Sequence, residues 1–200
     1  DINESIELFS VKNGKIRFGL GAVKGVGLSA VESIVKERET NGKYTSFEDF
    51  AQRSESKILN KRLVENLIYA GAFDCFGKTR SQLINVYEDV VDRVSVIAKQ
   101  RESNQMSLFG LLSTDENKIE VNYPNLREFD VKVKLTHEKD VIGVYVTGHP
   151  LEQYAKYFEG LVFNTSMLEN VETDEDGNSV YLDVNDGMNV AMGGVITSTK

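Results

Sequence analysis

A chain of 200 residues is long enough for one domain of ordinary size or two small ones. Hydrophobic residues make up 40% and charged residues 27%, which excludes general disorder and predicts a hydrophobic core. No apolar run approaches the roughly 20 residues that cross a bilayer, and the first residues lack the zones of a signal peptide, so we expect neither a membrane span nor secretion. The single cysteine, Cys75, excludes an internal disulfide and a four-cysteine zinc site, and it favours a reducing cytoplasm.

The first half of the chain is predicted to be helical after an opening β-hairpin. Residues 6–18 alternate loosely around Asn13-Gly14, which is typical of a hairpin. Apolar spacing then changes to that of helices, and Ser46 followed by Asp49 has the spacing of a capping box. Helices are predicted over residues 28–39, from residue 46, over residues 60–69 and over residues 79–102.

The second half has weaker periodicity. Residues 103–130 lose it, and we interpret them as a linker that is flexible in places. Helical spacing returns over residues 135–146 and 151–158, and residues 172–178 have the composition of an acidic turn. Alternation at Val180, Leu182 and Val184, followed by the β-branched residues 190–197, predicts strands in the tail. The fold class expected is therefore mainly α with a small β portion.

Charge is distributed unevenly along the chain. The net charge of −8 argues against a nucleic-acid partner, because phosphate binding uses clustered Lys and Arg. Residues 12–101, however, carry 16 basic and 11 acidic side chains, whereas residues 102–200 carry 7 basic and 17 acidic ones. This asymmetry indicates that one part meets a polyanion, although the count alone also fits unevenly scattered, solvated charge.

The run Gly25-Val26-Gly27 lies between a short apolar segment and the helix predicted from Leu28. A tight turn with two glycines leaves backbone N–H groups exposed at the start of the second helix, where their partial positive charge attracts phosphate. This is the physical basis of the helix-hairpin-helix, a unit that binds the DNA backbone without reading base sequence. The candidate DNA-binding residues of this first bend are Lys24, Gly25, Val26 and Gly27.

A second bend has the same shape. The helix predicted over residues 60–69 is followed by a turn over residues 71–77, after which the next helix opens. Two such hairpins packed together can hold both strands of a duplex. From the residues alone, the glycines also fit a purely structural role in which they only end and begin helices. The candidate DNA-binding residues of the second bend are Gly71, Gly77, Lys78, Thr79 and Arg80.

Other phosphate, metal and catalytic motifs fail on spacing. The spacing of Gly19, Gly21 and Gly25 is one residue longer than that of the dinucleotide fingerprint. A P-loop ending at Gly77-Lys78-Thr79 would need its first glycine at position 72, which is Ala72. The acidic run 174–176 reads as solvated surface, and His137 and His149 lack partner cysteines for zinc. We therefore predict no nucleotide site and no metal site in the chain; that it holds no catalytic residue is what the family resemblance described next implies.

Four segments, in order, resemble the alpha subunits of bacterial DNA polymerase III, the C-family replicative polymerases. They are residues 16–27, residues 47–50 followed by 60–62 and 67–74, residues 137–151 and residues 192–197. The resemblance, together with a start at Asp1 and not at methionine, predicts that the chain is a piece of a longer protein. It implies the end of the fingers region over 1–45, a tandem helix-hairpin-helix over 46–102, a linker over 103–130, a helical connector over 131–160 and the incomplete start of an OB-fold over 161–200.

The resemblance also implies partners for the chain. The peptide Gln105-Met106-Ser107-Leu108-Phe109 is similar to the one by which this family holds the sliding clamp, and a polar anchor before two apolar side chains suits a hydrophobic pocket. The family further implies double-stranded DNA, other replisome subunits, a cytoplasmic location, and Mg²⁺-dependent polymerisation by the parent protein with its carboxylates outside this fragment. The alternative that the residues leave open is a self-contained helical adaptor for protein partners, with structural hairpins.

Overall fold

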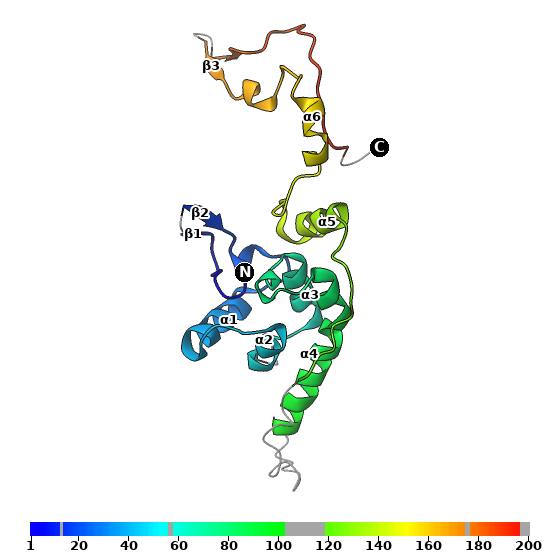
Figure 1. Ribbon diagram of the computed structural model, residues 1–200. Coiled ribbons are helices and arrows are strands. Elements are labelled where there is room, and N and C mark those ends of the chain that lie inside the picture. Colours follow the sequence, from blue (N-terminus) through cyan, green and yellow to red (C-terminus); the bar gives the residue numbers. More distant parts are fainter. Residues whose placement is uncertain (13, 56–57, 103–118, 175–176, 197–200) are drawn as a thin grey trace. The chain divides into compact units, whose positions relative to one another are not determined.

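The computed structural model describes residues 1–12, 14–55, 58–102, 119–174 and 177–196 (Figure 1). The chain divides into two compact units, Asp1–Val146 and Thr147–Lys200. The first unit is mainly helical with one short hairpin, and the second has short helices and one short hairpin, so the predicted fold class, mainly α with a small β portion, is confirmed. In the part of the chain that is described, no helix is both long and apolar enough to span a membrane.

The first unit opens with the predicted hairpin. Strands β1 (Ser10–Lys12) and β2 (Lys15–Arg17) pair antiparallel, with Ser10 opposite Arg17. A turn of 3₁₀ helix, η1 (Leu20–Ala22), then leads to helix α1 (Leu28–Asn41). Gly42 follows the last residue of α1 with φ 84°, a value that favours glycine. The sequence signal for this helix end is therefore local.

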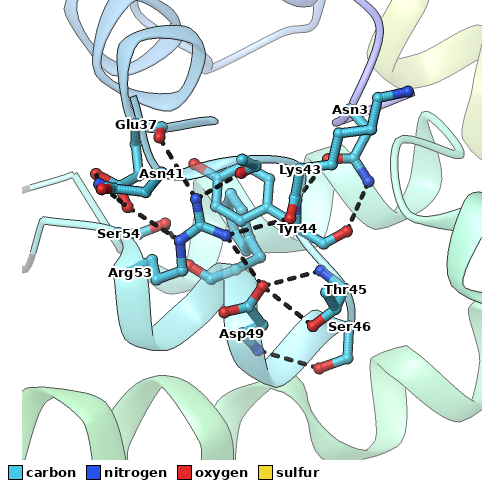
Figure 2. A network of polar contacts seen from close by, with 12 residues as sticks. Asn3, Glu37, Asn41, Lys43, Tyr44, Thr45, Ser46, Asp49, Arg53 and Ser54 are labelled. Atoms are coloured by element: carbon cyan, nitrogen blue, oxygen red, sulfur yellow. Dashed lines mark hydrogen bonds and ion pairs between the residues drawn. The ribbon is translucent and has the colours of Figure 1, made fainter. Parts of the chain in front are cut away.

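Helix α2 (Phe47–Arg53) begins at the predicted cap, where the hydroxyl of Ser46 accepts a hydrogen bond from the amide of Asp49 at 3.1 Å. Figure 2 shows how Arg53 fixes the connection between α1 and α2. Its guanidinium donates to the carboxylates of Glu37 at 2.9 Å and Asp49 at 3.1 Å, and to the carbonyl of Gly42 at 2.7 Å. These contacts hold α2 against the end of α1.

Helices α3 (Lys61–Tyr69) and α4 (Arg80–Glu102) pack against each other, with the 3₁₀ turn η2 (Asp74–Phe76) between them (Figure 1). At the centre of the core, the ring of Phe73 is fully buried and lies 4.9 Å from the ring of Phe50 and 5.2 Å from that of Phe47. Burial of three aromatic side chains in one cluster is a large source of stability. It fixes the turn after α3 against α2.

Residues 119–130, the described part of the predicted linker, form no regular element and pack against other residues of the first unit. Ile119 is buried, the side-chain amide of Gln82 donates to the carbonyl of Pro124 at 2.9 Å, and the hydroxyl of Ser81 donates to the carbonyl of Arg127 at 2.5 Å. Such backbone contacts have no sequence period, so the pattern of apolar residues could not reveal them.

Helix α5 (Val131–Ile142) was predicted four residues too far along the chain. Gly143 takes a left-handed conformation with φ 80°, and its amide caps the helix on the carbonyl of Lys139 at 3.0 Å. The helix therefore ends before Val144 and Val146, which have the apolar character of a helix face but are exposed. The glycine overrides the apolar spacing.

The second unit is largely exposed. It contains the 3₁₀ turns η3 (Glu152–Tyr154) and η4 (Thr165–Leu168), helix α6 (Ala155–Phe158), and strands β3 (Val171–Thr173) and β4 (Ser179–Tyr181), which pair antiparallel. The strand predicted over 190–197 does not form within the described residues 190–196, because a strand needs a neighbour to satisfy its backbone groups. The assignment of this tail to an OB-fold and the predicted domain boundaries stay predictions.

Candidate nucleic-acid interface

The first bend presents exposed backbone at the start of α1. Gly25 has φ 75°, which only glycine adopts without strain, and Gly27 stands at the N-cap of α1 in extended conformation. Gly27, Leu28 and Ser29 are exposed, and among the described residues their amides meet no hydrogen-bond acceptor. The next amide, that of Ala30, bonds the carbonyl of Gly27 at 3.0 Å. Three adjacent N–H groups are thus available to an anion.

Contacts from distant elements hold the first bend in place. The amide of Lys24 donates to the carbonyl of Val141 at 2.8 Å, and the side-chain amide of Asn66 donates to the carbonyl of Lys24 at 2.6 Å. The side chain of Val26 is buried in the core, whereas the side chain of Lys24 is exposed. Of the four candidate residues here, Val26 acts as an anchor, and Lys24, Gly25 and Gly27 lie at the surface.

The second bend is closed by a carboxylate of the same chain. Glu128 accepts hydrogen bonds from the amides of Arg80 at 3.1 Å and Ser81 at 3.2 Å, the first two amides of α4, and from the amide of Phe129 at 2.8 Å. The amide of Thr79 is also engaged, by the side chain of Gln82 at 3.1 Å. The prediction that this bend offers unoccupied amides to phosphate is therefore corrected, because an internal anion already fills the position.

The pKa of Glu128 reflects this position. Partial burial raises the pKa of its carboxyl, but hydrogen bonds from the amides of Arg80, Phe129 and Ser81, together with the charge of Lys134, outweigh burial and place the pKa below its ordinary value. The carboxylate is therefore ionised at neutral pH and complements the positive end of α4. An external phosphate would have to displace it.

The prediction that Arg80 binds DNA is also corrected. Its side chain is 3% exposed, and its guanidinium binds the carboxylates of Asp74 at 2.8 Å and Glu138 at 2.9 Å and the carbonyl of Tyr69 at 2.9 Å. The buried guanidinium cannot reach a duplex. Its physical role is to connect α3, η2 and α5 inside the protein.

The remaining residues of the second bend divide between structure and surface. A Cβ atom at Gly71, where φ is 72°, would lie 2.2 Å from Nη2 of Arg80, so this glycine gives the guanidinium room. The hydroxyl of Thr79 caps α4 by accepting from the amide of Gln82 at 3.2 Å. Gly77 and Lys78 are exposed, and the ammonium of Lys78 lies 4.6 Å from the centre of the Tyr123 ring.

Two residues important to these bends were missed from the sequence. Asn66 supports the first bend from α3, and Glu128 closes the second from a segment without periodicity. Each acts 42 or more residues from its partner, and no local pattern signals such a contact. The predicted clamp-binding peptide, Gln105 to Phe109, lies outside the described residues.

Comparisons with known proteins bear on both bends. A family model described as a helix-hairpin-helix motif matches residues 1–83, a stretch that includes both bends. Three similar proteins are each named DNA polymerase III subunit alpha. That of Chlamydia trachomatis serovar D is 40% identical over 178 residues, which are 82% of this chain and 14% of the relative.

The other two relatives match this chain over a similar share of its length and of their own. The protein of Xylella fastidiosa strain Temecula1 is 36% identical over 205 residues, covering 100% of this chain and 17% of the relative. The protein of Escherichia coli K12 is 36% identical over 163 residues, covering 81% of this chain and 14% of the relative. The chain thus spans 14–17% of the length of these relatives.

Proposed function

The chain belongs to the DNA polymerase III alpha family, and on that premise we propose that it holds the backbone of duplex DNA at the first bend. The observation that carries this proposal is the row of exposed amides at Gly27, Leu28 and Ser29, which have no acceptor among the described residues. The helix behind them, α1, is 14 residues long, so its dipole adds a partial positive charge at this end. Phosphate oxygens suit such a position, and no base is read there.

In this proposal the two bends are unequal. The first bend contacts DNA, while the second bend is a structural turn sealed by Glu128 and Arg80. Of the five candidate residues of the second bend, Gly77 and Lys78 are the exposed ones, so any contribution of these candidates to binding comes from the charge of Lys78. Backbone binding through few phosphates is weak by itself. It gains strength when a second contact is linked to it on the same chain.

We extend the proposal to the clamp. The peptide from Gln105 to Phe109 would supply the second, linked contact by binding the sliding clamp, and the two contacts together would support processive synthesis. Replacing Leu108 and Phe109 by alanine is expected to abolish binding of the clamp and to leave duplex binding intact. A calorimetric titration with purified clamp checks this, and unchanged affinity would contradict the clamp assignment.

The activity of the whole protein is proposed from the family. We propose that the parent protein is a DNA-directed DNA polymerase that uses Mg²⁺, acts with other replisome subunits and works in the cytoplasm. Within the ranges that the structure describes, no group of three His, Cys, Asp or Glu side chains converges as metal ligands would.

A salt titration of duplex binding tests the proposal. We expect a labelled duplex to bind the 200-residue chain, with an association constant that falls linearly with salt on logarithmic axes, because each neutralised phosphate releases a counterion. Affinity should be the same for duplexes of unrelated sequence. Absence of duplex binding at every salt concentration would contradict the proposal.

A protein-binding role has one observation in its favour. Beside α1, a pocket of about 500 Å³ is lined by four apolar residues, Ile6, Leu8, Val31 and Val35, and four charged ones, Glu7, Glu32, Lys36 and Glu39. Leu8 is 68% exposed. An adaptor that used this face alone would show no duplex binding at any salt, so the same titration separates the two functions.

A further inference from the structure

We propose that Arg62 of α3 is a second phosphate-binding group of the first bend, so that the second hairpin contributes to DNA binding through its helix and not through its own bend. This inference rests on the proposed function and names a further residue for it. It starts from the way in which α3 lies against the first bend. Arg62 and Asn66 are four residues apart on α3 and therefore share one face of the helix.

Distances place both side chains beside the bend. The side-chain amide of Asn66 is 2.6 Å from the carbonyl oxygen of Lys24. A Cβ atom at Gly25 would lie 3.1 Å from Nδ2 of Asn66 and 3.8 Å from Nε of Arg62. The missing side chain at Gly25 thus allows α3 to approach, and the guanidinium group lies directly against the bend.

The charge of Arg62 is not compensated within the described structure. Arg62 is exposed, and no ion pair joins it to an acidic side chain among the described residues. Its neighbour Lys61 differs, because its ammonium lies 3.0 Å from the carboxylates of both Glu88 and Asp92. Among the described residues, Arg62 thus places a positive charge without an acidic partner beside Gly25, two residues before the first of the three exposed amides.

The chemistry of the two groups is complementary. A phosphodiester has two non-bridging oxygens, and amides at a helix start can hold one of them while a guanidinium binds the other. Arginine suits this task better than lysine, since its planar group offers several donors in a fixed fork. The ligand class is therefore the backbone phosphate of nucleic acid, bound between α1 and α3.

The test compares Arg62→Ala with Arg93→Ala in the 200-residue chain. Arg93 is an exposed arginine of α4, so its variant loses the same charge away from the bend. Duplex binding is measured by fluorescence anisotropy over a range of salt concentrations, and thermal melting checks that both variants fold. We expect Arg62→Ala to weaken binding about tenfold near 0.1 M salt and to lower the salt slope by about 0.9, the value for one phosphate.

The outcomes separate this inference from the proposed function. Arg93→Ala should leave the salt slope unchanged, and Arg62→Lys should recover the slope but only part of the affinity, because lysine keeps the charge and loses the fork. If the unaltered chain binds duplex and both alanine variants lose affinity and slope equally, the role of Arg62 is overturned and the proposed function stands. If the unaltered chain binds no duplex, both fall.

Discussion

Replacing Arg80 by alanine is expected to destabilise the unit Asp1–Val146 by about 3–5 kcal/mol, the cost typical of breaking a buried ion pair from one side. The side chain of Arg80 is 3% exposed and that of Glu138 is 0% exposed, with 2.9 Å between the paired atoms. The variant leaves the carboxylate of Glu138 in the interior without the guanidinium. It also removes the donor to the carbonyl of Tyr69.

The assay is urea unfolding followed by far-ultraviolet circular dichroism, with Arg93→Ala as the exposed control. A cycle that adds Glu138→Ala should show strong coupling, because removal of both charges costs less than the sum of the single losses. Duplex affinity of the folded Arg80→Ala protein should match that of the control. An unchanged free energy of unfolding combined with a large loss of DNA binding would refute the structural role given to Arg80.

Three further predictions concern stability. Glu128→Gln should lower the free energy of unfolding by about 1–2 kcal/mol at pH 7. Because the pKa of Glu128 is lowered on folding, the stabilisation by its carboxylate is present above the unfolded pKa and is lost as pH falls through the folded pKa. The urea midpoints of the variant and the unaltered protein should therefore converge in acid. Phe73→Ala should cost about 3–5 kcal/mol in the same unfolding assay, because the ring is fully buried. Gly71→Ala should lower the melting temperature more than Gly77→Ala, since both glycines have positive φ but an added Cβ atom would clash with the guanidinium of Arg80 only at Gly71; equal losses would contradict that clash.

Sequence reasoning succeeded where the signal is local. The capping spacing at Ser46 and the glycine after α1 each act within a few residues, and both appear in the structure. The bend at Gly25 and Gly27 is also signalled locally, by two glycines before an apolar helical stripe, although contacts from Asn66 and Val141 hold it in place. Its role in DNA binding stays a prediction.

Sequence reasoning failed where a partner distant in the sequence determines whether a residue is exposed. The bend before α4 has the glycines and basic residues of a phosphate site, but Glu128 reaches its amides from 48 residues away. The sequence around Arg80 predicts an exposed cation, but its guanidinium is buried in an ion pair with Glu138, 58 residues further along the chain. Both contacts depend on the path of residues 119–130, which carries no periodic pattern.

The most direct test of the first bend removes one of its amides without removing the helix. Leu28 is the first residue of α1, is 55% exposed and follows Gly27 in extended conformation, a place where proline is well accommodated. Leu28→Pro deletes the N–H group, and Leu28→Ala shortens the side chain but keeps it. With equal melting temperatures, the proline variant should bind duplex DNA about tenfold more weakly than the alanine variant, since a hydrogen bond to a charged group contributes about 1.5–3 kcal/mol. Equal affinity of the two variants for duplex DNA would contradict the claim that these amides hold the phosphate backbone.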